Sequence, residues 1–301
     1  MSKRDRTNVH MDFLRIPTTH SLVIGSLQKP LLSATRVSQS DFDHGLLDPH
    51  VVEDAFMVSF QHISLKGELW VDGKNVTPPQ HRGGSIAIYD LRREWTANLL
   101  TPFDCVNFYL PRRILDAVSS AEGVSSVEDL YTRAGESIDD PTIRGLVVAL
   151  NQALDSPKEA NTLFVDQIGL ALASHLVKTY SDASSAKGID EAPLLSPVQV
   201  NRIKNLVESN LDGGVSLPEI STSCDLPINV IANGFTKAEG ITLYGWLQKR
   251  RIEVAKELLS HRNTSMDDIA GLSGFSSVDQ LSRVFEHVTG LSPSQWQREF
   301  A

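Results

Sequence analysis

The stretch DDIAGLSGFSSVDQLSRVFEHVTGLSPSQW, which runs from Asp267 to Trp296, determines how the end of the chain folds. Two short amphipathic patterns meet in it at Gly274, where a tight turn needs a positive φ angle. Phe275 follows at a position that favours entry into the core. The second pattern has an apolar stripe on one helical face, made up of Leu281, Val284, Phe285 and Val288. The stretch therefore predicts two short helices that pack against each other across a glycine turn.

The same pattern occurs once more, earlier in the chain. Positions 216, 220, 225 and 226 match positions 265, 269, 274 and 275 at one spacing, and positions 231, 235 and 240 match positions 281, 285 and 290 at a spacing one residue longer. Four serines are each followed three residues later by an acid or amide side chain, as in a capping box: Ser216, Ser265, Ser276 and Ser292. One supersecondary unit is therefore used twice, at about 216–239 and 265–289.

A helix predicted from Leu243 to Ser260 joins the two copies. At 1.5 Å per residue it would span about 27 Å, which is close to the roughly 34 Å of one turn of DNA. The outward residues of the second copy are small or hydrogen-bonding, namely Ser277, Gln280, Ser282, Arg283 and His287. For one isolated hairpin of this kind, a merely solvated helical face would be the favoured interpretation. Two joined copies favour a double helix-turn-helix that enters the major groove.

The charge of the chain restricts the way in which it can bind nucleic acid. The net charge is -9, from 28 Lys and Arg against 37 Asp and Glu, and this excludes a protein that coats nucleic acid without regard to sequence. The densest positive cluster is Lys249, Arg250 and Arg251, within QKRRIEVAK. These side chains could meet phosphates or could only cap and solubilise a helix. We expect a small, local and salt-sensitive contact face.

Residues from about Leu194 to Phe300 resemble the DNA-binding domain of the AraC/XylS family of bacterial transcription regulators. RIEVAKELL is similar to the family's linking helix, and the second copy has the family's signature residues at Ile269, Ala270, Gly274, Phe275, Leu281, Arg283, Phe285, Gly290, Pro293 and Trp296. The resemblance implies a regulator, expected here to be an activator, that binds double-stranded DNA and touches RNA polymerase. The expected DNA contacts are Ser277, Gln280, Ser282, Arg283, Ile228, Asn229, Asn233, Lys237, Lys249 and Arg250.

The first copy departs from the family pattern. Asp225 stands where a turn glycine is usual, and Asn233 stands where an arginine is usual. Gly234 lies inside the predicted recognition helix, at a cost of roughly 1 kcal/mol relative to alanine. Apolar contact and amide pairing could still read bases, but this copy is expected to bind more weakly. A protein-interaction module with degenerate DNA contact is the alternative function.

The first part of the chain has a different hydrophobic pattern. Short alternating runs from about 33 to 110 predict strands, and a helical period follows from about 111 to 180. Asp72 and Gly73 suit a tight hairpin turn between two of the strands. A linker composition at 181–193 divides a domain of residues 1–180 from a domain of residues 194–301. The predicted class is multidomain α+β, with an all-α C-terminal domain.

The N-terminal domain resembles the family's sensing and dimerisation domain, a cupin-like β-barrel followed by helices. The resemblance implies a small-molecule effector and a homodimer formed through a helix such as 161–180, whose leucine stripe could equally be internal core. Polar or aromatic members of the strands are pocket candidates: Phe60, His62, Trp70, Tyr89, Trp95 and Tyr109, with Arg82 or Arg92 for an anion. Each could instead be a core or surface residue without a ligand.

Other classes of function receive little support from the sequence. A cupin-type enzyme would need a metal site, but no His-x-His pair accompanies His44, His50, His62 and His81, and no nucleophile elbow or phosphate-binding glycine loop occurs. We therefore expect no enzyme, metal or cofactor. No apolar run suits a signal peptide, and the longest apolar stretch is broken by Asp166 and His175. A cytoplasmic protein without membrane contact is expected.

Overall fold

The computed structural model describes residues 20–24, 32–76, 80–121, 126–130, 133, 135–181, 195–212, 214–260 and 264–300. The chain forms two compact units. Unit 1 comprises Met1–Ala160 and Ile168–Glu191, and unit 2 comprises Asn161–Gln167 and Ala192–Ala301. Most of the predicted linker, 182–193, lies outside the described residues. The predicted domain boundary therefore stays a prediction.

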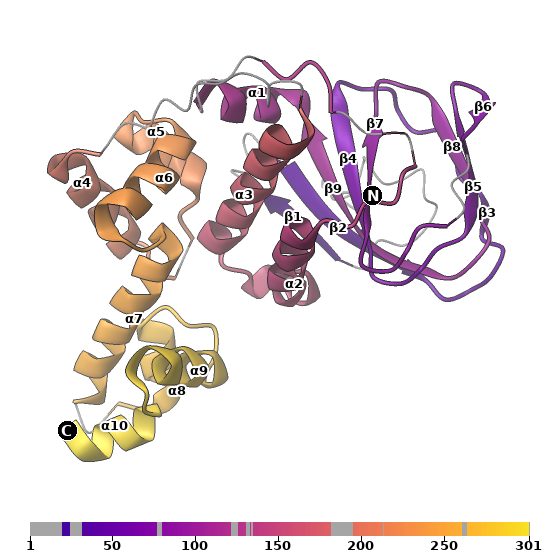
Figure 1. The fold of residues 1–301 in the computed structure, drawn as a ribbon. Coiled ribbons are helices and arrows are strands. Elements are labelled where there is room, and N and C mark those ends of the chain that lie inside the picture. The colour runs from indigo at the N-terminus through magenta and orange to yellow at the C-terminus, as the bar shows by residue number, and fades with distance from the viewer. Residues whose placement is uncertain are drawn as a thin grey trace, which may run out of the picture. The chain divides into compact units, whose positions relative to one another are not determined.

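In its described residues, unit 1 contains two antiparallel sheets, two α-helices and most of a third (Figure 1). The five-stranded sheet has the order β1 (His20–Ile24), β2 (Leu32–Gln39), β9 (Phe103–Pro111), β4 (Ala55–Gln61) and β7 (Ile86–Asp90). The four-stranded sheet has the order β3 (Gly45–Leu46), β8 (Trp95–Leu99), β5 (Gly67–Val71) and β6 (Lys74–Asn75). The helices are α1 (Arg112–Ala121), α2 (Pro141–Asp155) and α3 (Thr162–Tyr180), with a short 3-10 turn at Pro157–Glu159.

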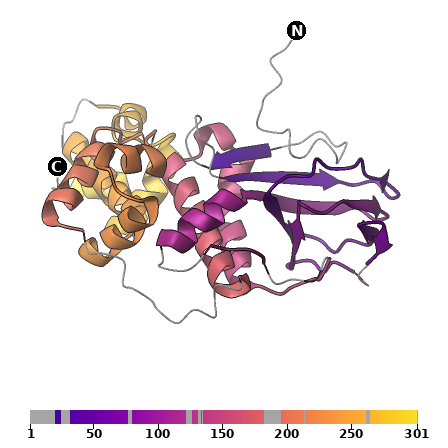
Figure 2. The same cartoon turned by 90° about the horizontal axis from the view of Figure 1, so that it is seen from above.

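The five-stranded sheet lies between the four-stranded sheet and the helices, as Figure 2 shows from above. Its interior strand β4 is buried at all seven positions, because both of its faces are covered. Met57 belongs to the apolar core between the sheets, together with Trp95 and Tyr109. Side chains alternate between the two faces of a strand, so Phe56, the neighbour of Met57, lies on the opposite, helical side of the sheet.

The strand pairing confirms the mixed α+β class. In the described residues, the pairing divides the strands between two separate sheets and does not close a barrel. The predicted hairpin turn is confirmed: Val71 pairs with Lys74, and Asp72 and Gly73 have φ angles of 50° and 73°. Two successive positive φ angles match the right-handed twist of the strands, which is why this dipeptide suits the turn.

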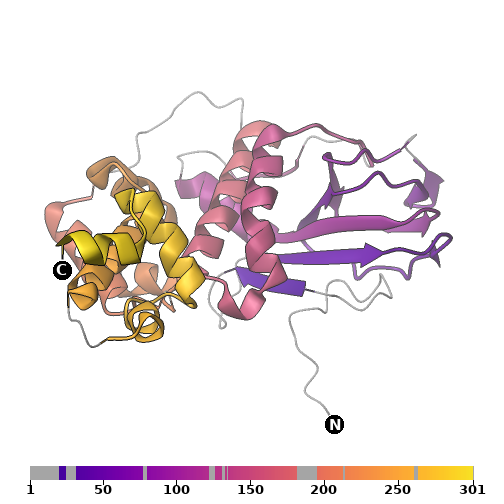
Figure 3. The same ribbon diagram turned by 90° about the horizontal axis from the view of Figure 1, so that it is seen from below.

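Helices α2 and α3 are fixed to each other by the buried carboxylate of Asp140. It accepts a hydrogen bond from the Ile143 N–H as the N-cap of α2. The same side chain accepts from the Tyr180 hydroxyl and contacts His175 Nε2, each at 2.7 Å, near the end of α3. Figure 3 shows α2 and α3 side by side. The part of the leucine stripe of α3 that lies in unit 1 is internal core, because Leu172 and Leu176 are fully buried.

Unit 2 is helical. Its helices are α4 (Pro197–Glu208), α5 (Leu217–Cys224), α6 (Ile228–Glu239), α7 (Leu243–Leu259), α8 (Met266–Leu272), α9 (Val278–Thr289) and α10 (Pro293–Phe300). The predicted starts at Ser216, Ser265 and Ser292 are confirmed by side-chain caps. The prediction of Ser276 and Asp279 as a cap is wrong by one residue, because Ser277 caps α9 by accepting from the Gln280 N–H. In the described part of the chain, no helix is both long and apolar enough to cross a membrane.

The buried ring of His81 makes the stability of unit 1 dependent on pH. Burial lowers the pKa of His81 below its ordinary value of 6.5. The unfolded chain therefore binds a proton more readily than the folded chain. The contribution of this histidine to stability is complete above about pH 6.5 and is lost as the pH falls through the folded pKa.

We expect His81→Gln to reduce the loss of stability between pH 7.5 and pH 5.5, because glutamine does not take up a proton. Urea unfolding of the wild type and the variant at both pH values measures this difference. Part of the loss should remain, since burial also lowers the pKa of His62. An identical pH dependence in the two proteins would contradict the assignment.

Candidate nucleic-acid interface

The two predicted copies have the same backbone turn between their helices. Helix α5 ends at Asp225, which is left-handed with φ 54° and ψ 48°, and the turn after α8 contains Gly274 with φ 85°. The next residue in each copy bonds back to a carbonyl in the preceding helix: the Leu226 N–H to Ser221 at 3.1 Å, and the Phe275 N–H to Ala270 at 2.8 Å. Asp225 therefore adopts the conformation for which the family uses glycine, as short polar side chains can.

The likeness of the two copies continues beyond the second helix of each. Helices α6 and α9 both end at a left-handed glycine, with φ angles of 71° and 78°. Phe235 meets Trp246 edge to face at 6.3 Å and 77°, and Phe285 meets Trp296 at 6.1 Å and 73°. Sequence reasoning missed this tryptophan pair, although its spacing equals that of the two phenylalanines. The repeated unit therefore includes the start of the helix that follows.

The inward stripe of α9 is mostly as predicted. Leu281 and Phe285 are fully buried, and they pack with Ile252 of α7 in one apolar core. Val288 is the exception, because 38% of it is exposed. The predicted outward residues Arg283 and His287 are exposed, and Ser282 is half-buried. Helix α9 therefore presents a polar face along most of its length.

Two of the predicted contact residues also fix the start of α9. The Ser277 hydroxyl accepts from the Gln280 N–H at 3.2 Å. The Gln280 Oε1 atom accepts from the backbone N–H and the hydroxyl of Ser276, at 2.9 and 3.0 Å. Paired recognition of adenine needs both the oxygen and the nitrogen of a glutamine amide. Gln280 can therefore donate to a base while it caps, but it must leave the cap to recognise adenine with both atoms.

Arg283 is the outward cation of α9. Its Nε atom donates to the Asp279 carbonyl at 3.4 Å, one helical turn earlier. Such a long bond constrains the side chain only weakly. The terminal nitrogens form the planar fork that suits guanine or a phosphate.

The first copy presents fewer groups for recognition. Asn233 and Lys237 are exposed on α6, and Ile228 is half-buried at its start. The side chain of Asn229 lies outside the described residues. Gly234 is buried, so it does not interrupt the outward face.

The basic cluster of α7 is divided between the surface and the interior. Lys249 is exposed, and Arg250 forms an ion pair at 2.9 Å with Glu208 of α4. Arg251 is buried, with 2% of its surface exposed. It therefore neither caps nor solubilises the helix, and only Lys249 and Arg250 of this cluster contribute to the surface.

The six pocket candidates of unit 1 do not all lie together. Tyr89, Trp95 and Tyr109 belong to the core between the two sheets. Trp95 stacks on Tyr89 at 5.2 Å and on His50 at 4.8 Å.

The remaining candidates have other surroundings. Phe60 and His62 contact each other edge to face at 5.1 Å, and alternation places Phe60 on the helical side of β4. Trp70 is half-buried, and it alternates with the two buried residues of β5, so it faces away from the core. The structure thus gathers three of the six predicted pocket residues.

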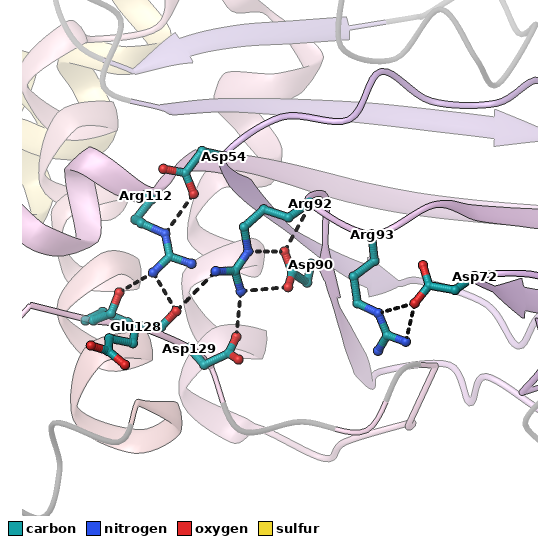
Figure 4. A network of polar contacts seen from close by, with 9 residues as sticks. Asp54, Asp72, Asp90, Arg92, Arg93, Arg112, Glu128 and Asp129 are labelled. Atoms are coloured by element: carbon teal, nitrogen blue, oxygen red, sulfur yellow. Dashed lines mark hydrogen bonds and ion pairs between the residues drawn. The ribbon is translucent and has the colours of Figure 1, made fainter.

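Of the two arginines considered for an anion, Arg92 is already paired. It forms ion pairs with Asp90 at 2.7 Å and with Asp129 at 2.9 Å, as Figure 4 shows. The guanidinium groups of Arg92 and Arg112 each lie 5.5 Å from the centre of the Phe56 ring. This network joins the loop at 127–129 to the end of the sheet. Arg82, the second candidate, is exposed.

Two groups that an enzyme could use, His50 and Cys105, have other partners or an unsuitable protonation state. Both ring nitrogens of His50 lie 2.8 Å from backbone carbonyl oxygens. Burial raises the pKa of Cys105 to about 12, so its thiol is protonated near neutral pH. Within the described ranges, no group of three His, Cys, Asp or Glu side chains could hold a metal ion.

Comparison with known proteins identifies the repeated unit. Residues 226–299 match a family described as a helix-turn-helix domain. The transcriptional activator NphR of Rhodococcus sp is 25% identical over 233 residues, which cover 72% of this chain and 63% of that protein. The probable transcriptional regulator LumQ of Photobacterium leiognathi is 30% identical over 95 residues, which cover 32% of this chain and 38% of that protein. The chain spans less than two thirds of the length of both relatives.

Among solved structures, a probable AraC family transcriptional regulator from Rhodopseudomonas palustris CGA009 is 18% identical. The likeness covers 34% of this chain and 96% of that chain, with a TM-score of 0.31.

Replacement of Arg283 with alanine should weaken binding to a duplex selected by the wild type by about 1 to 3 kcal/mol, if Arg283 reads a base. Binding to an unrelated duplex should change much less. Titration of both duplexes at fixed salt measures the two effects.

Arg250→Ala is the matched control on α7. It should lower the salt dependence of binding by about one unit of slope, with sequence preference retained, if Arg250 leaves Glu208 to meet a phosphate. Unchanged binding by folded Arg283→Ala would remove Arg283 from the contact surface.

Proposed function

Unit 2 contains a helix-turn-helix domain of the AraC/XylS type, and from this premise we propose that the chain is a sequence-specific DNA-binding regulator of transcription. Helices α6 and α9 enter two successive segments of the major groove. The observation that carries this proposal is the repetition of one helix-turn-helix geometry at both ends of α7. A scaffold that did not bind DNA would have no need of the same outward helix twice.

The length of α7 supports the use of both copies on one DNA molecule. Its 17 residues span about 26 Å at 1.5 Å per residue. One helical turn of DNA is about 34 Å. Phe235 of α6 contacts Trp246 near the start of α7, whereas Leu281 and Phe285 of α9 pack with Ile252 further along it. The two helices can therefore reach adjacent major-groove segments on the same face of the duplex.

Specific binding depends on a few cations in an acidic chain. Lys237, Arg283 and Lys249 are exposed, and Arg250 can exchange its carboxylate partner for a phosphate. The overall charge of -9 opposes association with phosphates at a distance. Affinity should therefore depend strongly on base contacts and on salt. A cytoplasmic location, where a regulator meets DNA, is part of this proposal.

Activation of transcription through contact with RNA polymerase is the mode that the relatives favour, because one of them is named a transcriptional activator. A protein-interaction module that has lost DNA contact is the second candidate. The observations that favour it are the small recognition surface of α6 and the capping bonds of Gln280.

Unit 1 serves as the sensing domain in this proposal, with the two sheets as a cupin-like fold that holds a small effector between them. A row of buried polar side chains crosses the inner face of the five-stranded sheet. Strand register aligns Thr35 with Asn107 and Asn107 with Ser59. The amide nitrogen of Gln61 donates to the Ser59 hydroxyl at 2.9 Å, whereas Gln61 Oε1 is buried without a partner in the described residues.

An unpaired buried acceptor favours a ligand that can donate a hydrogen bond to it. The adjacent aromatic core of Tyr89, Trp95 and Tyr109 suits an uncharged ligand with an apolar face. We propose an uncharged effector with O–H or N–H groups. Self-association remains part of the proposed sensing role, and it would use a surface other than the buried leucine stripe of α3.

A thermal-shift screen of monosaccharides, polyols and small amides tests the effector site. A compound that binds the folded chain should raise its melting temperature, and at 100 times its Kd the stabilisation is about 2.7 kcal/mol. Gln61→Met keeps the side-chain volume but removes the acceptor, so it should reduce this shift. Arg82→Met, on an exposed residue, is the control. An equal shift in the wild type and Gln61→Met would place the ligand elsewhere.

Selection of bound sequences from a random duplex library, with the full chain at fixed salt, tests the proposed function. We expect two enriched boxes about one helical turn apart for each bound chain. One box would reduce the first copy to a scaffold. No enrichment by the folded chain, with or without the compounds that raise its melting temperature, would favour the interaction module.

A further inference from the structure

Arg251 lies near the middle of α7 and has the largest fully buried side chain among the described residues. Burial lowers the pKa of its guanidinium group, because the charged form loses water. Arginine nevertheless stays ionised in proteins, so this position carries a buried charge. Apolar residues of similar volume often stabilise such a position as well as a charge does. The contacts of this arginine therefore suggest a role other than stability.

The guanidinium group joins parts of unit 2 that are far apart in sequence. Its Nε atom donates to the Leu211 carbonyl at 2.6 Å, in the segment that leads from α4 to the first helix-turn-helix. Its central carbon lies 5.4 Å from the centre of the Phe275 ring, in the turn of the second helix-turn-helix. One side chain of the linking helix thus contacts the turn of the second copy and the segment that leads into the first copy.

The turn of the second copy also packs directly on the same carbonyl. Gly274 has φ 85°, and a Cβ atom there would collide with the Leu211 carbonyl oxygen and lie 3.0 Å from Arg251 Nε. A side chain is therefore excluded both by the backbone angle and by the lack of space. The equivalent residue of the first copy, Asp225, is exposed and keeps its side chain. This close contact belongs to the second copy alone.

We propose that Arg251 is a positioning residue that fixes α6 and α9 relative to each other and so sets the spacing of DNA boxes that the protein accepts. The inference rests on the proposed function. The segment at Leu211 leads through α5 to α6, and Phe275 leads directly to α9. The joint made by Arg251, Leu211, Gly274 and Phe275 therefore transmits the position of one recognition helix to the other.

The chemistry of arginine suits this task. The hydrogen bond to a carbonyl fixes the guanidinium group along one direction, and stacking on an aromatic ring fixes it along a second. Methionine fills a similar volume but adapts its shape and has no directional donor. Lysine keeps a charge and a donor but lacks the plane that stacks on the ring.

The test measures binding of the full chain to three duplexes. The first is the two-box duplex that the wild type selects. The second has two base pairs added between the boxes, which rotates one box by about 70° relative to the other. The third contains only the box read by α9. That box is the one at which Arg283→Ala changes binding. The spacing ratio is the affinity for the first duplex divided by the affinity for the second.

We expect the wild type to have a spacing ratio of at least about ten, since two fixed helices cannot both follow a rotated box. Arg251→Met should bring the ratio close to one while affinity for the one-box duplex stays within about twofold of the wild type. Arg251→Lys and Phe275→Leu should give intermediate ratios. Arg250→Met, next to it on the surface, should weaken binding to all three duplexes and keep the ratio.

Tryptophan fluorescence melting establishes that each variant is folded. If Arg251→Met does not fold, the ratios of Arg251→Lys and Phe275→Leu decide. If the folded variants at Arg251 and Phe275 keep the spacing ratio of the wild type, the role of Arg251 is overturned and the proposed function stays intact. A wild type that prefers no duplex would overturn the proposed function and this inference together.

Discussion

The left-handed residue between the two helices of each copy is the constraint on which unit 2 depends. A right-handed helix cannot continue through a positive φ angle, so α5 and α8 end there and the chain changes direction. The following N–H bonds back into the preceding helix, which fixes the angle at which α6 or α9 departs. Asp225 and Gly274 provide the same turn with different side chains. The position of each recognition helix thus follows from one backbone conformation.

The two copies differ in what surrounds this turn. At Gly274 the backbone lies against Leu211 and Arg251, so a side chain is excluded, whereas Asp225 faces solvent. The second copy is therefore joined to the linking helix by its turn, in addition to its apolar core with α7. The two copies are similar in sequence, but the second copy has this additional contact with the linking helix. This asymmetry agrees with the richer polar face of α9.

Local patterns predict what local physics determines. The repeat, three of four capped helix starts and the Asp72–Gly73 turn depend on neighbours in sequence, and all were predictable. Arg251 was not, because its partner Leu211 is 40 positions away and its neighbours Lys249 and Arg250 suggest a surface cluster. Gln280 was assigned only to DNA, although its cap could have been found by moving the start of α9 by one residue. In unit 1, alternation predicts strands but does not distinguish two facing sheets from a closed barrel, and β4 is buried on both faces.

The most direct test of the central claim is a methylation-interference footprint of the full chain on the duplex it selects. Methylation of guanine N7 blocks contacts in the major groove. Two helix-turn-helix copies fixed to one linking helix predict two groups of interfering guanines, about ten base pairs apart and on one face of the DNA. A single group of interfering guanines, or two groups on opposite faces, would contradict the account.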